Sequence, residues 1–483
     1  NVSCIQYDPN NTNVFYAGTG ESYTGGDAGG DGVWKSSDGG MTWSKILGGI
    51  SGTTTFQSAS YLTINNPAGI AGNYASFPTT SFGPSITSLI TANIVLVVDN
   101  TAPTSDGCET ITNAADLSGK IALIRRGTCN FTVKVKAAQN AGAVAVIMMN
   151  NASGVPVAMG GTDATITIPS VMISQADGNI LETALGSGTI NGTLSPSTAG
   201  VVTGNIVPGI QFINDLVVRN NGGNSEIYVA NGDSYSNGAY MGSPTYGVYK
   251  SVDGGATWTL LNLPLTVAGN RHCPNDIEIG ADNKIWVSTT ESTAFGDGGG
   301  KIFSSVDGGA TFTDKFTVTG NGGGARVEIE ASNTIADKLY VLAQLNQATT
   351  TAAVEVKIIK TTDGFITSTE TAMPVGNETR ETTYGFTGGQ AFYDLMIESD
   401  PSNDQIVYVG GIDLYRSANG GNSWTVISDW TANVHSDQHA MAFKPNNSNI
   451  GIFGNDGGVY YSVSLSSTGI AATSRNNGFN VTQ

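Results

Sequence analysis

Two histidines and an aspartate alternate with other residues near the C-terminal end of the sequence: His435, Asp437 and His439. Residues two apart on a β-strand point to the same face, so this spacing would bring two imidazoles and a carboxylate together. Such a set can hold a metal ion, with His272 as a further ligand. The same pattern also anchors loops through hydrogen bonds, so the metal remains unknown at this stage.

A second set of charged residues stands where short alternations of apolar and polar residues begin. These are Asp215, Asp276, Arg326 and Asp394, with Asp437 one position off. If the strands surround one axis, the four carboxylates and the guanidinium form a rim that can bind a ligand, hold a metal or supply an acid–base pair. Alternatively, aspartates at strand starts cap loops by accepting bonds from backbone amides. We predict a binding site from these residues together with His435 and His439.

The elements that would position these residues follow from a repeated motif, Ser-x-Asp-x-Gly-x-Thr-Trp. It is complete at 36–43 and 251–258 and has Phe for Trp at 305–312; weaker copies stand at 361–368 and 417–424. Each copy follows an apolar alternation, which predicts a strand, a turn and a return strand. The aspartate can bond the turn backbone, and glycine supplies positive φ. The structural side chains are Asp38, Asp253, Asp307, Asp363 and, replacing aspartate, Asn419.

The spacing of the copies indicates the architecture. Those after the first begin at residues 251, 305, 361 and 417, a period of 54 to 56 residues. Four-stranded units repeating at about 40 to 50 residues are typical of a β-propeller, and the period here leaves room for longer loops. Six blade starts are visible. We therefore predict a mainly β fold, a multi-bladed propeller of six visible blades and of seven or more in a longer polypeptide.

The repeat resembles the Asp-box, or BNR repeat, of sialidases, xyloglucanases and sortilin-type receptors. That resemblance implies radial four-stranded blades with each Asp-box between the two outer strands. Residues 476–483 are similar to stretches that lead into another blade in bacterial Asp-box proteins. We therefore favour a fragment of a longer chain, which would leave open blade edges for further copies or downstream segments.

An inserted domain separates the first two copies of the repeat. Its motifs are Gly-Lys-Ile-Ala-Leu-Ile-Arg-Arg-Gly-Thr-Cys-Asn-Phe at 119–131, a helical pattern at 132–141, an apolar strand at 143–149 and Ile-Pro-Ser-Val-Met-Ile-Ser at 168–174. These resemble the protease-associated (PA) domain, an α/β unit that is non-catalytic and is thought to bind peptides or gate a neighbouring site. The expected domains are 1–54 (blade 1), 55–203 (PA) and 204–483 (blades 2–6).

Cysteine content and charge bound the compartment and the partners. Cys108 and Cys129 stand at positions that resemble a disulfide pair found in many PA domains. The pairing of Cys4 and Cys273 stays open. A disulfide implies an oxidising compartment, so we expect an extracellular or surface location. The net charge of −18 disfavours nucleic acid and anionic membranes. The apolar runs are too short to span a bilayer.

The sequence carries few of the motifs by which known classes of hydrolase are recognised. The chain has no Gly-x-Ser-x-Gly elbow and no His-Glu-x-x-His, so a protease is improbable. The chain lacks the opening motif and the arginine set of a sialidase, so that activity is disfavoured. A xyloglucanase-like glycosidase would use two carboxylates, and 454–458 faintly resembles a segment that carries a catalytic aspartate, here Asp456. The catalytic candidates for that alternative are Asp276, Asp437 and Asp456.

Two glycine-rich loops, 25–32 and 295–300, carry aspartates that can offer oxygens to Ca²⁺. The whole chain resembles secreted surface proteins of Bacteroidetes that combine Asp-box propellers with extra domains. We predict a secreted or surface protein that binds proteins or glycans through propeller loops and the PA domain without catalysis. The alternative is a glycoside hydrolase with paired carboxylates near the propeller axis.

Overall fold

The fold was obtained as a computed structural model that describes residues 2–24, 28–50, 54–151, 155–197, 201–206, 209–236, 239–240, 242–243, 245–320, 322–346, 355–376, 381, 384–431, 434–467 and 469–477. The chain divides into two compact units. The propeller unit comprises Asn1–Gly49, Ile210–Ser234 and Ser243–Gln483, and the PA unit comprises Ile50–Gly209 and Tyr235–Gly242. Each unit is described by itself.

The propeller unit consists of six four-stranded antiparallel sheets that follow one another in the chain, and each is one blade. Blades 1 to 3 are β1 (Val2–Asp8), β2 (Asn11–Thr19), β3 (Gly32–Ser36), β4 (Ser44–Leu47); β17 (Ile213–Asn221), β18 (Asn224–Asn231), β21 (Gly247–Ser251), β22 (Thr259–Leu260); and β23 (Cys273–Ile279), β24 (Ile285–Thr290), β25 (Lys301–Ser305), β26 (Thr313–Thr317). Blades 4 to 6 are β27 (Gly324–Ala331), β28 (Leu339–Leu345), β29 (Val356–Thr361), β30 (Thr369–Glu370); β31 (Met396–Asp400), β32 (Asn403–Gly410), β33 (Leu414–Ser417), β34 (Thr425–Ser428); and β35 (Gln438–Lys444), β36 (Asn447–Asn455), β37 (Gly458–Ser462), β38 (Ala472–Ser474).

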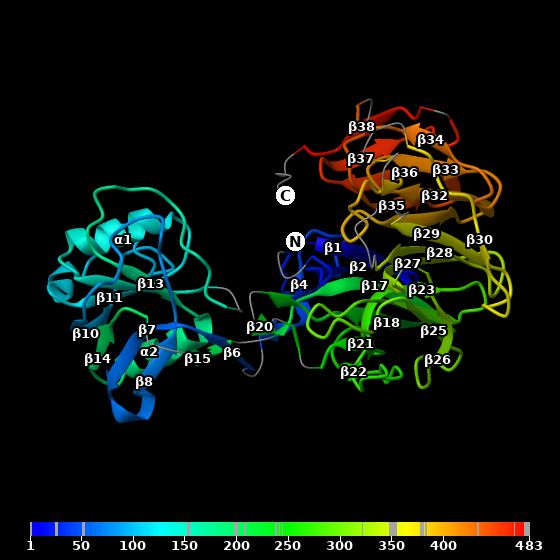
Figure 1. The fold of residues 1–483 in the computed structure, drawn as a ribbon. Helices are drawn as coiled ribbons and strands as arrows, with labels where there is room; N and C mark the ends of the chain where they lie inside the picture. The colour runs from blue at the N-terminus through cyan, green and yellow to red at the C-terminus, as the bar shows by residue number, and fades with distance from the viewer. Residues whose placement is uncertain are drawn as a thin grey trace. The chain divides into compact units, whose positions relative to one another are not determined.

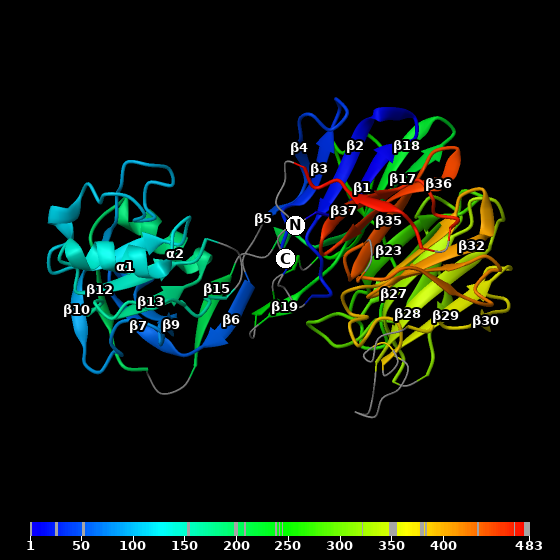
Figure 2. The same ribbon diagram turned by 90° about the horizontal axis from the view of Figure 1, so that it is seen from above.

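The first strand of each blade is its innermost strand. Consecutive innermost strands β1, β17, β23, β27, β31 and β35 pack side by side in that order. Figure 1 shows the blades succeeding one another from blue through green and yellow to red, and Figure 2 shows the same order from above. The predicted mainly β, six-bladed propeller is confirmed.

Five of the six blades carry the repeated motif as a turn between their two outer strands. In blade 2, Asp253 accepts hydrogen bonds from the Thr257 amide (2.9 Å) and from the Ser251 hydroxyl (2.8 Å). The same bonds recur around the other four side chains predicted for these turns, Asp38, Asp307, Asp363 and Asn419. We call these segments Asp turns. Their common geometry confirms the predicted position between the outer strands.

The hydrophobic core of the propeller lies between neighbouring blades. One cluster joins Tyr16 and Val33 of blade 1 to Leu216 and Val229 of blade 2, and similar clusters link the later blades. The period-two pattern of the strands explains this arrangement, because alternate side chains of each sheet face the next blade.

The PA unit is built around an eight-stranded mixed sheet. Its strands run in the order β8 (Gly72–Ala75), β7 (Ser60–Asn66), β14 (Ile190–Leu194), β10 (Ile90–Leu96), β11 (Ile121–Arg125), β12 (Ala145–Met149), β13 (Ser170–Ile173) and β9 (Phe77–Pro78). Helices α1 (Phe131–Asn140) and α2 (Gln175–Leu185) accompany it, with short 3-10 turns at Ala68–Ile70 and Ala114–Leu117. Cys108 and Cys129 are disulfide-bonded with Cα atoms 5.7 Å apart, as predicted.

The remaining short strands form two-stranded sheets: β5 (Gly49–Ile50) pairs with β16 (Gly209–Ile210), β6 (Thr54–Ser58) with β15 (Val202–Ile206), and β19 (Tyr235–Ser236) with β20 (Ala239–Tyr240). The hairpin of β19 and β20 belongs to the PA unit although it lies in the sequence of blade 2, which the sequence did not predict. Cys4 and Cys273 are not joined to each other. No helix in the described part of the chain has the length and apolar character needed to cross a bilayer.

Candidate functional site

Strand register shows which residues occupy equivalent places around the propeller axis. Cys4, Asp215 and Asp276 each stand one residue before the member of their strand that pairs opposite Ala17, Val229 or Val287. The equivalent residues of blades 4, 5 and 6 are Glu328, Met396 and Ala440. The predicted equivalence of Arg326 and Asp394 with Asp215 and Asp276 is therefore wrong by two residues. The innermost strands start at different points relative to β-bulges, which a count from sequence cannot see.

Asp215 and Asp276 serve the backbone of the next blade. The Ile277 amide donates to Asp215 (3.0 Å), and the Ile329 amide donates to Asp276 (2.7 Å). In blade 1 the Cys4 thiol takes the same place and bonds the Leu216 amide. These side chains satisfy N–H groups at the edge of the neighbouring sheet, which is the capping role that the sequence left open as the alternative.

Further carboxylates, which the sequence analysis missed, extend this group along the axis. Glu278, Glu330 and Glu398 lie two residues beyond the equivalent places in blades 3, 4 and 5 and interact electrostatically. Burial raises the pKa of Asp215 and of Glu330 to about 7, and burial with neighbouring carboxylates raises that of Asp276. We call Asp215, Asp276, Glu278, Glu328, Glu330 and Glu398 the axis carboxylates. Their signal in the sequence is acidic residues alternating with isoleucine and valine.

Arg326 is placed among aromatic and acidic groups at the end where the innermost strands begin. Its guanidinium lies 3.7 Å from the ring centre of Tyr23, a residue of the blade 1 loop. It pairs with Glu328 at 2.6 Å and donates to the Tyr393 carbonyl at 2.8 Å. The Tyr23 hydroxyl donates to Glu21 (2.8 Å). Arg326 thus links blades 1, 4 and 5 around the axis.

Asp394, one residue beyond Tyr393, has a side chain with 0% exposure, and neither carboxylate oxygen accepts a hydrogen bond from another of the described residues. Burial, reinforced by the charge of Asp437, raises its pKa to about 9. A carboxyl group in this environment is neutral at pH 7 and can donate a proton. The structure therefore brings the predicted residue Asp394 close to Asp437 and to Arg326.

The most elaborate polar contacts at this end centre on Asp456. Its Oδ1 accepts from the Tyr393 hydroxyl (2.8 Å) and is 2.8 Å from His439 Nε2. Asp437 hydrogen-bonds the same carboxyl group and takes a bond from Gln390 (3.2 Å). The side chains of His439 and Asp456 keep 25% and 22% of their surface exposed. We call Tyr393, Asp394, Asp437, His439 and Asp456 the rim cluster.

The two aspartates of this pair have pKa values pushed in opposite directions. Burial and the neighbouring Asp456 charge raise the pKa of Asp437. Burial would also raise the pKa of Asp456, but the bonds from His439 and Tyr393 outweigh it and lower the value. Two carboxyl groups that share a proton in this way can exchange it with a ligand. Asp437 also has φ of 63°, a backbone conformation that is uncommon outside glycine and clusters at functional sites.

The predicted trio of His435, Asp437 and His439 does not form on one strand. β35 begins at Gln438, so only His439 lies in it, and the positive φ of Asp437 breaks the alternation. His435 is exposed and packs against Gly457. His272 bonds a loop of blade 3 instead: its Nδ1 is 2.8 Å from the Gly298 carbonyl, and burial lowers the pKa of its imidazole. Asp456, found in the sequence only as a catalytic candidate, is what joins Asp437 to His439.

The calcium hypothesis is partly outside the described residues, because 25–27 are not among them. In the second loop, Asp297 accepts from the Thr266 hydroxyl (2.8 Å) and from the side-chain amide of Asn270 (3.1 Å), so the carboxylate ties its loop to the segment that precedes β23. Among described residues, one group of three acids is close enough to share an ion: Asp99, Asp106 and Glu109 of the PA unit. The buried Lys134 ammonium lies 3.5 Å from Asp106 and already neutralises that group.

Comparison with known proteins identifies the inserted unit. The PA domain family matches residues 90–181. A receptor homology region, transmembrane domain- and RING domain-containing protein of Oryza sativa subsp. japonica is 42% identical over 85 residues, which cover 17% of this chain and 16% of that protein. A probable leucine aminopeptidase 2 of Aspergillus fumigatus is 39% identical over 94 residues, 18% of each chain. The chain thus spans less than a fifth of either relative, and the similarity concerns the PA unit.

Solved structures give likenesses of low TM-score. The GH74 enzyme of Niastella koreensis is 15% identical with a TM-score of 0.36 and covers 99% of this chain and 59% of its own. The GH74 xyloglucanase of Xanthomonas campestris is 15% identical with a TM-score of 0.37, over 57% of this chain and 43% of its own. An aminopeptidase from Aneurinibacillus sp. strain AM-1 is 25% identical with a TM-score of 0.23, over 38% and 37%. The propeller itself rests on the strand topology described above.

Proposed function

We propose that this protein is an extracellular binding protein that holds a glycan or a protein partner at the rim cluster, with the PA unit as a second recognition surface. The observation that carries the proposal is the difference in how carboxylates are used. Asp215 and Asp276 are committed to backbone amides, whereas Asp456 is surrounded by side chains and remains partly exposed. Polar side chains that converge at a partly open place are typical of ligand sites.

The chemistry of the rim cluster suits a ligand rich in hydroxyl groups. Carboxylates, an imidazole and a phenol can each accept or donate one hydrogen bond to a sugar hydroxyl. Phe392, 48% exposed and 6.4 Å from the Tyr393 ring, adds an aromatic surface beside them. The Cys108–Cys129 disulfide supports an oxidising compartment.

Binding is tested by calorimetric titration with β-glucan oligosaccharides, sialosides and peptides. Asp456→Asn keeps the size of the side chain but removes its charge, and we expect at least about a tenfold loss of affinity. The matched control is Asp314→Asn, an exposed carboxylate on β26, which should bind as the native protein does. Equal affinity of Asp456→Asn and the native protein would remove the rim cluster from the binding site.

A second candidate function, glycoside hydrolysis, is favoured by the opposed pKa shifts of Asp437 and Asp456, the arrangement expected for an acid and a base. Their hydrogen-bonding separation is shorter than the roughly 5 to 9.5 Å between the two carboxyl groups of glycosidases. A glycosidase would therefore pair one of them with another group. Turnover of any panel glycan that Asp437→Asn abolishes and Asp314→Asn leaves intact would replace the binding proposal by this one.

A further inference from the structure

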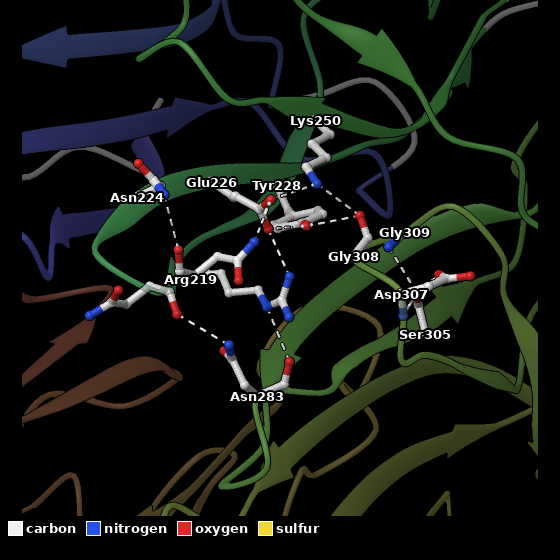
Figure 3. A network of polar contacts seen from close by, with 12 residues as sticks. Arg219, Asn224, Glu226, Tyr228, Lys250, Asn283, Ser305, Asp307, Gly308 and Gly309 are labelled. Carbon is white, nitrogen blue, oxygen red and sulfur yellow. Dashed lines mark hydrogen bonds and ion pairs between the residues drawn. The ribbon is translucent and has the colours of Figure 1, made fainter.

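Neighbouring blades of the propeller are joined by a recurring set of bonds that runs in one direction, from each blade to the next. Figure 3 shows the set between blades 2 and 3, where Lys250 and Tyr228 reach the turn that contains Asp307 and Gly308. Lys250 Nζ donates to the Gly308 carbonyl at 2.9 Å, and the Tyr228 hydroxyl donates to the same oxygen at 3.0 Å. The first glycine of an Asp turn is thus held by the preceding blade.

The lysine bond recurs at other blade junctions. Lys35 donates to the Gly254 carbonyl (2.9 Å) between blades 1 and 2, and Lys360 donates to the Gly420 carbonyl (2.8 Å) between blades 4 and 5. Each lysine stands at the same place of the third strand, opposite the aromatic residue of the second strand. The junction of blades 3 and 4 has Ser304 at that place. Phe365 there replaces the second glycine of the turn and stacks on Phe316 at 4.8 Å.

The second glycine of the turn receives a side chain from the preceding blade. A Cβ atom on Gly255 or Gly309 would lie 2.5 Å from Ile46 or Leu261, and one on Gly421 would lie 3.0 Å from Thr371. The tryptophan of the turn also bonds backward. The indole of Trp258 donates to the Ile46 carbonyl at 3.0 Å, and the indole of Trp424 donates to the Ala372 carbonyl at 2.7 Å.

Blade 1 carries the same receiving groups, but nothing in the described residues covers them. A Cβ atom on Gly39 would meet no atom within 4 Å, and one on Gly40 would meet only the ring of Trp43 at 3.9 Å. The Trp43 indole bonds only within its own turn, to Gly40 (3.0 Å). Met41 is 84% exposed.

The innermost strand of blade 1 is uncovered in the same way. Ile5 is 56% exposed and Tyr7 is 47% exposed, whereas Leu216 and Ile277, which are equivalent to Ile5, are 0% exposed. The amides of Leu216 and Ile277 are those bonded by the preceding blade. We call Ile5, Tyr7, Gly39, Gly40, Met41 and Trp43 the receiving face of blade 1.

Blade 6 does not complement this face. Tyr461 stands where Lys250 stands in blade 2, Arg475 follows the fourth strand where Leu261 does, and Ala440 takes the place of Asp215. Its innermost strand β35 has no packing against β1 comparable to that between consecutive blades, as far as the described residues extend. The sixth blade therefore lacks the three groups that join blade 1 to blade 2 and blade 2 to blade 3.

We propose that the receiving face of blade 1 binds a further four-stranded blade that residues 1–483 do not contain. The chemistry of that blade follows from the junctions. Its innermost strand offers an Asp, Glu or Cys to the Ile5 amide, its third strand offers a lysine or arginine to the Gly39 carbonyl, and an aliphatic or threonine side chain after its fourth strand fills the space over Gly40. The contact that joins consecutive blades would thus be repeated once more, between the added blade and blade 1.

The test adds such a blade and follows protection of the receiving face. Residues 210–272, which contain blade 2 and its connection to the next blade, are fused ahead of Asn1, because Asn1 stands three residues before Cys4 as Cys273 stands three residues before the equivalent Asp276. Hydrogen–deuterium exchange of segment 2–8 is compared between the fusion and the unfused chain. We expect exchange in this segment to slow at least about tenfold in the fusion.

The matched control carries Lys250→Met and Leu261→Ser in the added blade only, and its segment 2–8 should exchange nearly as fast as in the unfused chain. Equal exchange in the fusion and the unfused chain overturns the proposal. Segment 2–8 already protected in an unfused monomer means that the chain covers the face itself, which also overturns it. A concentration-dependent dimer in sedimentation that Tyr7→Asp dissociates assigns the face to a second copy instead.

Discussion

The axis carboxylates and the rim cluster differ in what their oxygens contact, although both contain aspartates where innermost strands begin. Asp215 and Asp276 accept from the amides of Ile277 and Ile329 in the next blade. Asp456 accepts from the side chains of Tyr393 and His439. A carboxylate bonded to backbone is fixed by the fold, whereas one bonded to side chains can exchange those partners for a ligand.

A residue type at a repeated position therefore does not define its role. Each blade must satisfy the edge amides of the next, so the axis carboxylates are part of the fold. Blades 5 and 6 hold Met396 and Ala440 at the equivalent places, so neither offers a carboxylate to an edge amide there. The nearby aspartates Asp394, Asp437 and Asp456 are then available for chemistry.

The largest expected effect concerns pH. The pKa values of Asp215 and Glu330 are about 7 in the folded protein and about 4 when unfolded, so both groups bind protons more tightly in the fold. Their contribution is complete below pH 4 and is lost as pH rises through 7. We expect the free energy of unfolding of the propeller unit to fall by about 5 kcal/mol between pH 5 and 8, with both groups contributing. Urea denaturation measures it.

Two variants sharpen the pH prediction. Glu330→Gln should reduce the slope of stability against pH, since the amide does not titrate, and Asp314→Asn on the exposed strand β26 should leave the slope unchanged. A stability that rises from pH 5 to pH 8 would show that the axis carboxylates are ionised in the fold, contrary to their burial.

The next effect separates the two regions by mutation. Asp276→Ala leaves the Ile329 amide without its acceptor, and we expect a loss of about 2 kcal/mol at pH 5, where repulsion among the carboxylates is least. Asp437→Ala removes a partly exposed group whose partner Gln390 can bond water, and the loss should stay below about 1 kcal/mol. Chemical denaturation of both variants checks the order, and a larger loss for Asp437→Ala would reverse the comparison.

Sequence reasoning could find the propeller because the motif and the apolar alternation are local signals. Ser251 to Trp258 and its copies carry their turn bonds within eight residues, and the PA motifs are similarly continuous. The rim cluster is not local: Tyr393 comes from the loop before the first strand of blade 5, whereas His439 and Asp456 come from β35 and the end of β36 in blade 6. Their meeting depends on β-bulges and loop paths, so the sequence grouped Asp437 with His439 and with Asp394, indicated Asp456 only as a catalytic candidate, and missed Tyr393.

A smaller effect on stability is expected from the bonds that join the third strand of one blade to the Asp turn of the next blade. Lys250 bonds both Glu226 and the Gly308 carbonyl (Figure 3). Burial alone would raise the pKa of Glu226, but side-chain hydrogen bonds to it, the one from Lys250 first among them, lower that pKa to about 2. Lys250→Met keeps the apolar stem and removes the charge, and we expect a loss of about 1.5 kcal/mol. Lys301→Met, which breaks the more exposed pair with Asp314 and an exposed bond to the Thr317 hydroxyl, should cost no more than about 0.5 kcal/mol. Equal losses in thermal denaturation would show that the blade-to-blade bond contributes nothing.

The smallest expected effect is at the aspartate of an Asp turn, because the bonds of the Asp253 side chain lie within the turn itself. Asn419 already replaces aspartate in blade 5 and keeps the bond from the Ser423 amide at 2.9 Å, so Asp253→Asn should lower the melting temperature at pH 7 by less than Lys250→Met does. The pKa of Asp253 is lowered to about 2 by its bonds to Thr257 and Ser251, so its contribution is present above pH 4 and is lost as pH falls through 2. The asparagine variant should therefore lose less stability than the native protein between pH 4 and 2. Melting curves at both pH values, with Asp253→Ala as the variant that removes the acceptor, decide whether hydrogen bonding or charge holds the turn.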